Sequence, residues 1–229
     1  MSVYVKTVEN LNTLASGKFK EFSSKIINSN KPLIGVKIPT LKEIAKSLLN
    51  GGWQNYLIEC KFKYFEDTLI YGLIIAKLEK DEFYKYIGVY LSQIDSWAHV
   101  DSFVPQIKFI KKDKENFFRE IEEKIFSSQG FYLRYYLICP LNYFLEEYYL
   151  EKIFKTVEKV DGKGYYNDMA IAWLISVAFV KFERETLDFI KNCKLSDFTL
   201  NKSISKIRDS FRVTPENKVL VQNFIRKKQ

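Results

Sequence analysis

The stretch SWAHVDSFVP at residues 96–105 is the segment around which this chain is organised. We expect a helix to begin there. Trp97 and Asp101 are four residues apart, so a helix places them on one face, one turn apart. An indole beside a carboxylate can hold an electron-poor ring or a cationic sugar. Alternatively, Trp97 packs into a helix–helix contact, and Asp101 caps a neighbouring helix or pairs with an arginine.

The composition is that of a folded chain without a membrane segment. Its 229 residues are 47% hydrophobic and 28% charged, which fits one domain over residues 1–229 and excludes a disordered chain. The longest apolar runs, such as residues 69–76, are too short to cross a bilayer. No apolar segment typical of a secretory signal follows Met1. We therefore expect a cytoplasmic protein.

The few potential metal ligands are scattered. Three separated cysteines favour neither a disulfide framework nor a zinc site, and they are Cys60, Cys139 and Cys193. The single histidine, His99, excludes a centre with several histidines. It lies two residues after Trp97, on another helical face, and we interpret it as a bystander. We expect no metal and no cofactor.

The net charge of +8, from 36 basic and 28 acidic residues, favours a polyanionic partner, most simply nucleic acid. A lysine-rich composition gives the same excess without any functional cause, so charge alone leaves both interpretations open.

The apolar spacing of three and four residues predicts helices, and the scarcity of glycine (9) and proline (5) disfavours an all-β fold. Short antiparallel helix pairs in sequence are typical of an α-solenoid, an α–α superhelix of stacked repeats. A compact helical bundle is the competing architecture. The expected helical segments are 3–30 (one or two helices), 41–49, 53–60, 65–79, 81–93, 97–111, 114–128, 131–144, 146–160, 165–182, 184–192, 201–211 and 215–227.

Two residues of the second half stand out by their surroundings. Arg134 is the only charge in the run FYLRYYLI, and an unpaired buried guanidinium is costly. It pairs with Asp101 or binds a phosphate with two hydrogen bonds. Trp173 lies two turns into a helix that begins near Tyr165, on the face of Ala170, which leaves room beside the ring. Trp173 is otherwise a core residue.

Residues 201–212 combine an apolar stripe with a basic face. Lys202 and Lys206 are four residues apart, and Arg208 and Arg212 repeat this spacing, as on a helix laid along a phosphate backbone. Any solvated basic helix face has the same pattern. The residues expected on the apolar stripe are Ile204, Ile207 and Phe211.

Four segments, in this order, resemble motifs of the AlkC/AlkD family of DNA alkylation repair proteins, and the resemblance spans about residues 18–225. They are LIGVKIPTLK (33–42), SWAHVDS (96–102), LR (133–134) and AIAW (170–173). The resemblance implies an α-solenoid of HEAT-like repeats with a basic concave face that embraces duplex DNA. It also implies a DNA glycosylase of base excision repair that hydrolyses the N-glycosidic bond of cationic N3- and N7-alkylated purines.

By this resemblance Asp101 is the catalytic carboxylate, Trp97 and Trp173 are the walls around the lesion, and Arg134 holds a phosphate. We expect Lys202 and Lys206 to contact further phosphates of a duplex that contains alkylated purines, and we expect the protein to act as a monomer.

Two departures from the family pattern define an alternative. Residues 23–28 lack the aromatic side chain that active members have before the Gly-Val motif, and the bulky Tyr135 and Tyr136 follow Arg134. The alternative is a weak or inactive glycosylase that serves as a DNA-binding HEAT-like scaffold. A protein–protein interaction scaffold is the third hypothesis.

Overall fold

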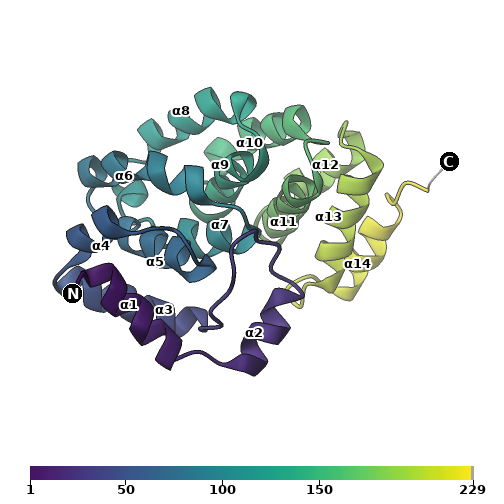
Figure 1. Cartoon of the computed structure of the whole chain (residues 1–229). Coiled ribbons are helices and arrows are strands. Elements are labelled where there is room, and N and C mark those ends of the chain that lie inside the picture. Colours follow the sequence, from purple (N-terminus) through teal and green to yellow (C-terminus); the bar gives the residue numbers. More distant parts are fainter. Residues whose placement is uncertain (228–229) are drawn as a thin grey trace. The chain divides into compact units, whose positions relative to one another are not determined.

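The computed structural model describes residues 1–227, which form fourteen α-helices and three short 3₁₀ helices (Figure 1). No strand occurs in this range, so the all-α prediction is confirmed. None of the helices within residues 1–227 combines the length and apolar character that a membrane span requires. The chain divides into two compact units, Met1–Lys112 and Asp113–Gln229. The single domain expected over residues 1–229 stays a prediction, because two compact units can belong to one domain.

The first unit is built around one fully buried helix. Every residue of α5 is buried, and its sequence FEDTLIYGLII is apolar on all sides after the polar first turn at residues 66–68. The helices α3, α4, α6 and α7 pack against it, and α1 packs on α4. The helices of this unit are α1 (Val3–Thr13), α2 (Gly17–Ser24), α3 (Ile38–Asn50), α4 (Trp53–Glu59), α5 (Phe65–Ile75), α6 (Lys80–Gln93) and α7 (Trp97–Phe103).

The helix predicted over residues 97–111 begins where expected but ends early. The Ser96 hydroxyl caps it by accepting a hydrogen bond from the N–H of Ala98 at 3.3 Å. The second half of the prediction is wrong, because α7 ends at Phe103. Pro105 has no N–H to continue the helical hydrogen-bond ladder. The chain instead forms two 3₁₀ helices, Val104–Gln106 and Phe109–Lys112.

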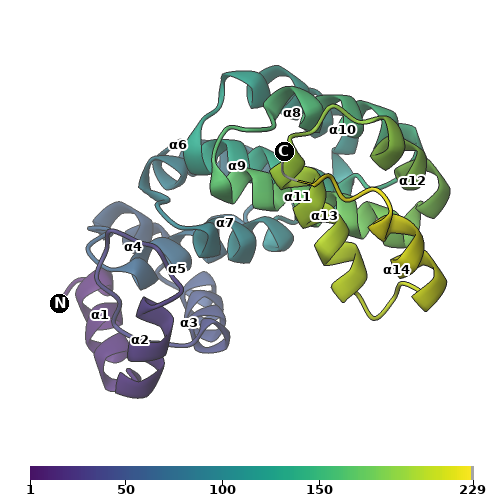
Figure 2. The ribbon, with the colours of Figure 1, turned by 90° about the vertical axis from the view of Figure 1, so that its right-hand side faces the viewer.

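The second unit consists of two layers of helices. The helices α9, α11 and α13 pack side by side, while α8, α10 and α12 lie on the other side of the unit (Figures 1 and 2). The C-terminal helix α14 packs on α13. The bounds are α8 (Lys114–Lys124), α9 (Gly130–Tyr143), α10 (Glu147–Val160), α11 (Tyr165–Lys181), α12 (Glu183–Asn192), α13 (Asp197–Asp209) and α14 (Pro215–Gln222), with a 3₁₀ helix at Ile125–Ser127.

The apolar stripe expected near the C-terminus is confirmed in part. Ile204 and Ile207 are completely buried. Phe211 was predicted wrongly as a third member, because its side chain is fully exposed (103%). The helix α13 ends at Asp209, and Ser210 adopts an extended conformation that turns the following residue out of the helical register.

Candidate functional site

The helix α7 presents Trp97 and Asp101 on one partly exposed face. Both residues are half-buried, whereas Ala98, His99 and Val100 between them are buried. This arrangement agrees with the four-residue spacing. The indole N–H of Trp97 donates a hydrogen bond to the carbonyl of Ile26, with 3.3 Å between the two heavy atoms. Trp97 therefore contacts the segment that follows α2, and this contact fixes its ring.

His99 has a structural role that the sequence did not reveal. Its side chain is completely buried, and its ring stacks on that of Phe65, with 4.4 Å between the centroids. Its Nε2 atom lies 3.1 Å from the Phe65 carbonyl oxygen, and its Nδ1 atom lies 3.3 Å from Oδ1 of Asp95. Asp95 also accepts hydrogen bonds from the Ser29 hydroxyl and the Asn30 N–H. His99 thus ties α7 to α5 and to the loop after α2.

The environment lowers the pKa of both His99 and Asp95. Burial lowers the pKa of His99, because a charged imidazolium would lose its hydration. Burial opposes ionisation of Asp95 as well, but the hydrogen bonds with His99 and Ser29 outweigh it and lower the pKa of Asp95. The contacts of the two His99 ring nitrogens hold α7 in place.

The segment at residues 33–36, part of the N-terminal motif, folds around one buried carboxylate. Glu66 is 1% exposed and accepts hydrogen bonds from the N–H groups of Ile34 at 2.9 Å, Gly35 at 2.8 Å and Val36 at 3.3 Å. Gly35 has a φ of 105°, and an added Cβ would lie 2.7 Å from Cβ of Lys20. Sequence reasoning missed this role of Glu66, although two adjacent acidic residues, Glu66 and Asp67, at the start of a mostly apolar helix were a signal.

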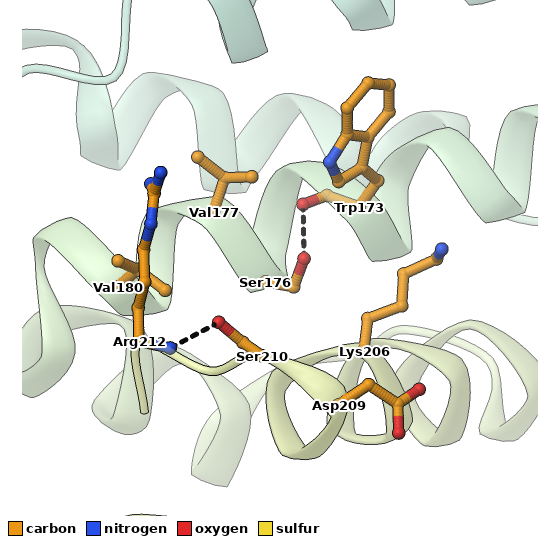
Figure 3. Close-up of a pocket in the computed structure, with 8 residues that line it drawn as sticks. All are labelled: Trp173, Ser176, Val177, Val180, Lys206, Asp209, Ser210 and Arg212. Atoms are coloured by element: carbon orange, nitrogen blue, oxygen red, sulfur yellow. Dashed lines mark hydrogen bonds between the residues drawn. The ribbon is translucent and has the colours of Figure 1, made fainter. Parts of the chain in front are cut away.

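A pocket of about 350 Å³ lies between α11 and the end of α13 in the second unit (Figure 3). Trp173, Lys206 and Arg212 line it, with Ser176 and Ser210 between Arg212 and Lys206 (Figure 3). The structure therefore brings together Trp173 and Lys206, which the sequence singled out for different reasons. The remaining lining residues are Val177, Val180 and Asp209.

The polar groups of this pocket suit an anion that carries a planar ring. Lys206 and Arg212 provide two positive charges, and Asp209 provides one negative charge. The Ser176 hydroxyl donates to the Trp173 carbonyl at 2.8 Å, and the Ser210 hydroxyl accepts the N–H of Arg212 at 3.2 Å. Cations bind phosphate, and an indole face stacks on a base. A nucleotide is the ligand class that combines both.

Lys202 and Arg134 have different surroundings in the second unit. Lys202 is exposed on α13, one turn before Lys206, and its Nζ atom lies 5.8 Å from the centroid of the Phe198 ring. Arg134 is buried on α9, and its guanidinium donates to the carbonyl of Tyr166 at the start of α11. This contact links α9 to α11. The phosphate-binding role of both residues stays a prediction.

Tyr135 and Tyr136 are buried core residues. They are 2% and 4% exposed, and their rings pack edge to face with 4.9 Å between the centroids. Their bulk therefore fills the interior.

No family model matches this chain, and no curated protein matches it. Within residues 1–227, no cluster of three histidine, cysteine or acidic side chains could hold a metal ion. Trp97 and Asp101 belong to the first unit, and the other predicted site residues, Arg134, Trp173, Lys202 and Lys206, belong to the second. The joint site expected for all six stays a prediction.

Proposed function

We propose that this chain is an AlkD-like DNA glycosylase with an α-solenoid fold of HEAT-like repeats. Its substrate is duplex DNA that contains cationic N3- or N7-alkylated purines. The observation that carries the proposal is the pocket that Trp173, Lys206 and Arg212 line together. The sequence predicts an aromatic wall at Trp173 and a phosphate-binding cation at Lys206, and the two predictions come from separate features. The four motifs in order add support.

Hydrolysis of the glycosidic bond of an alkylated purine needs few catalytic side chains. An alkylated purine carries a positive charge, so its glycosidic bond is already weak. As the C1′–N bond breaks, the purine takes the electron pair and leaves as a neutral base, while positive charge develops on the deoxyribose. The carboxylate of Asp101 stabilises this charge and orients a water molecule. The water oxygen bonds to C1′ and loses a proton, which completes the hydrolysis.

The aromatic and basic side chains bind the substrate. An indole face stabilises a cation by about 0.5–2 kcal/mol, so Trp97 and Trp173 favour the alkylated base over a neutral one. Lys206 and Arg212 contact phosphates, which position the duplex without reading its sequence. Both tryptophans are half-buried, which leaves part of each side chain accessible to a ligand.

A non-catalytic DNA-binding scaffold is the second candidate. The pocket at Trp173 supports nucleic-acid binding by itself, and residues 23–28, at the end of α2, lack an aromatic side chain. This candidate predicts an affinity for DNA that falls steeply with salt and does not depend on Asp101.

The experiment is base release from methylated duplex DNA, with the wild type, Asp101→Asn and the control Asp81→Asn, which changes an exposed aspartate of α6. The glycosylase proposal predicts release by the wild type and the control, and a loss of about 100-fold or more in Asp101→Asn. If all three proteins bind DNA and none releases base, the glycosylase proposal is wrong and the DNA-binding scaffold is the remaining candidate. If none binds DNA, both candidates are wrong.

A further inference from the structure

A second hollow, of about 390 Å³, lies between α10 and α12 and has an apolar floor. The rings of Phe154 and Phe189 stack there, with 4.2 Å between the centroids and 11° between the planes. Leu150 extends this floor along α10. Leu150 and Phe154 are buried, whereas Phe189 is half-buried, so the floor belongs to the core and still reaches the surface. We call this hollow the α10–α12 groove.

The rim of the α10–α12 groove is acidic. Its only lining cation is Lys155, which forms an ion pair with Glu151 one turn away. Glu158 accepts the N–H of Lys194. The remaining three rim carboxylates are exposed and take part in no ion pair among the described residues, and they are Glu147, Glu185 and Asp188. The groove is therefore a negative site on a chain of net charge +8.

The charge of the groove excludes nucleic acid as its occupant and favours a cation. A polyanion would be repelled by the five carboxylates. The groove lies in the layer of α10 and α12, whereas the pocket at Trp173 is built from α11 and α13 of the other layer (Figure 2). An occupant of the groove thus uses different helices from those that form the Trp173 pocket.

The shape of the α10–α12 groove indicates which kind of cationic ligand fits it. A small polyamine would satisfy the rim but leave the apolar floor in contact with water. A hollow of this volume is at the small end of ligand pockets and holds a few side chains. An amphipathic helix places apolar and basic side chains on adjoining faces, which matches an apolar floor with acidic edges.

We propose that the α10–α12 groove docks a lysine- or arginine-rich amphipathic segment of a partner protein. An apolar side chain of that segment packs on Phe154 and Phe189, and its basic side chains pair with Glu147, Glu185 and Asp188. The proposal concerns other residues than the glycosylase proposal and does not depend on it.

The test uses the full chain and a fluorescent helical peptide of leucine and lysine, about 18 residues or five turns long. Fluorescence anisotropy measures its affinity for the wild type and for a groove variant, Glu147→Gln/Glu185→Gln/Asp188→Asn. The matched control is Glu9→Gln/Glu43→Gln/Asp81→Asn, which removes the same charge from exposed positions of the first unit. We expect about tenfold weaker binding in the groove variant and wild-type binding in the control.

Three results would overturn the proposal. Equal weakening in both variants would mean that the peptide binds by overall charge. Equally tight binding of spermidine, or of a lysine and serine peptide of the same charge, would mean that the apolar floor is not used. A wild type that sediments as a dimer, with the groove variant a monomer, would make a second copy of this chain the occupant.

Discussion

The Nδ1 atom of His99 lies 3.3 Å from Oδ1 of Asp95, and the two residues hold the helix that carries Trp97 and Asp101. His99 is completely buried, whereas Asp95 is half-buried and accepts hydrogen bonds from the loop at residues 29–30. The pair therefore links the protonation of one imidazole to the stability of the first unit.

The free energy of unfolding is expected to fall as the pH drops below about 6.5, the ordinary pKa of histidine. Burial lowers the pKa of folded His99, so the unfolded chain takes up this proton first and acid favours unfolding. Urea unfolding at a series of pH values measures the effect. In His99→Gln the decline between about pH 6.5 and 5 should be smaller, and an unchanged decline would show that another group causes it.

Asp67 predicts the opposite pH dependence. It is completely buried and accepts hydrogen bonds from the Tyr4 hydroxyl and the Tyr64 N–H, each at 2.9 Å. Burial raises the pKa of Asp67, so the folded state holds this proton more tightly than the unfolded state. Its contribution to stability therefore decreases as the pH rises from about 3.9, the ordinary value, through the raised one.

Replacement of Asp67 by asparagine removes this titration and keeps an acceptor for Tyr4. The difference in unfolding free energy between Asp67→Asn and the wild type should shift in favour of the variant as the pH rises from about 4 to 7. Asp81→Asn, at an exposed position, is the control and should show no such trend.

Replacement of a helical glycine by alanine should have opposite effects on stability at two positions. A Cβ on Gly72 of α5 would lie 2.6 Å from the ring of Tyr90, which is completely buried and donates its hydroxyl to the His99 carbonyl. Gly72→Ala should destabilise the protein by about 1–3 kcal/mol through overpacking. Gly88 of α6 has open space around it. Because alanine favours a helix more than glycine does, Gly88→Ala should stabilise the protein by about 0.5–1 kcal/mol. Thermal or urea unfolding measures the change in stability of both variants. Equal changes in Gly72→Ala and Gly88→Ala would contradict the close packing of α5 and α6.

The buried carboxylate of Glu66 predicts a large loss in Glu66→Gln. Oε2 accepts from Ile34, and Oε1 accepts from Gly35 and Val36. A glutamine has one acceptor oxygen, so its amide nitrogen would face a backbone N–H, at a cost of about 1.5–3 kcal/mol. Urea unfolding measures this cost against Glu43→Gln at an exposed site. A difference below about 0.5 kcal/mol would argue against these hydrogen bonds.

The pocket at Trp173 predicts a specific salt dependence. Lys206→Gln should weaken DNA binding and reduce the slope of log affinity against log salt by about one, because one phosphate contact is lost. Lys191→Gln, on an exposed position of α12, removes the same charge outside this pocket and should leave the slope unchanged. Equal slopes for both variants would place the DNA elsewhere.

Helix positions were largely predictable because helix formation depends on local spacing. The apolar periodicity of residues 146–192 predicts three helices, and α10, α11 and α12 begin and end within two residues of the prediction. The helix at Trp97 likewise begins where expected. Errors occur where a local break overrides the periodic pattern, as at Pro105 and at Ser210, after which Phe211 turns outward.

The sequence by itself determined that this chain is all-α and which helices carry the tryptophans, carboxylates and cations, since these properties depend on residues a few positions apart. Only the tertiary structure decided that Glu66 binds the backbone at residues 34–36, that His99 anchors α7, and that Trp173, Lys206 and Arg212 line one pocket. These partners are about 30 or more residues apart along the chain. Such contacts form when helices pack, and no local pattern records which faces will meet.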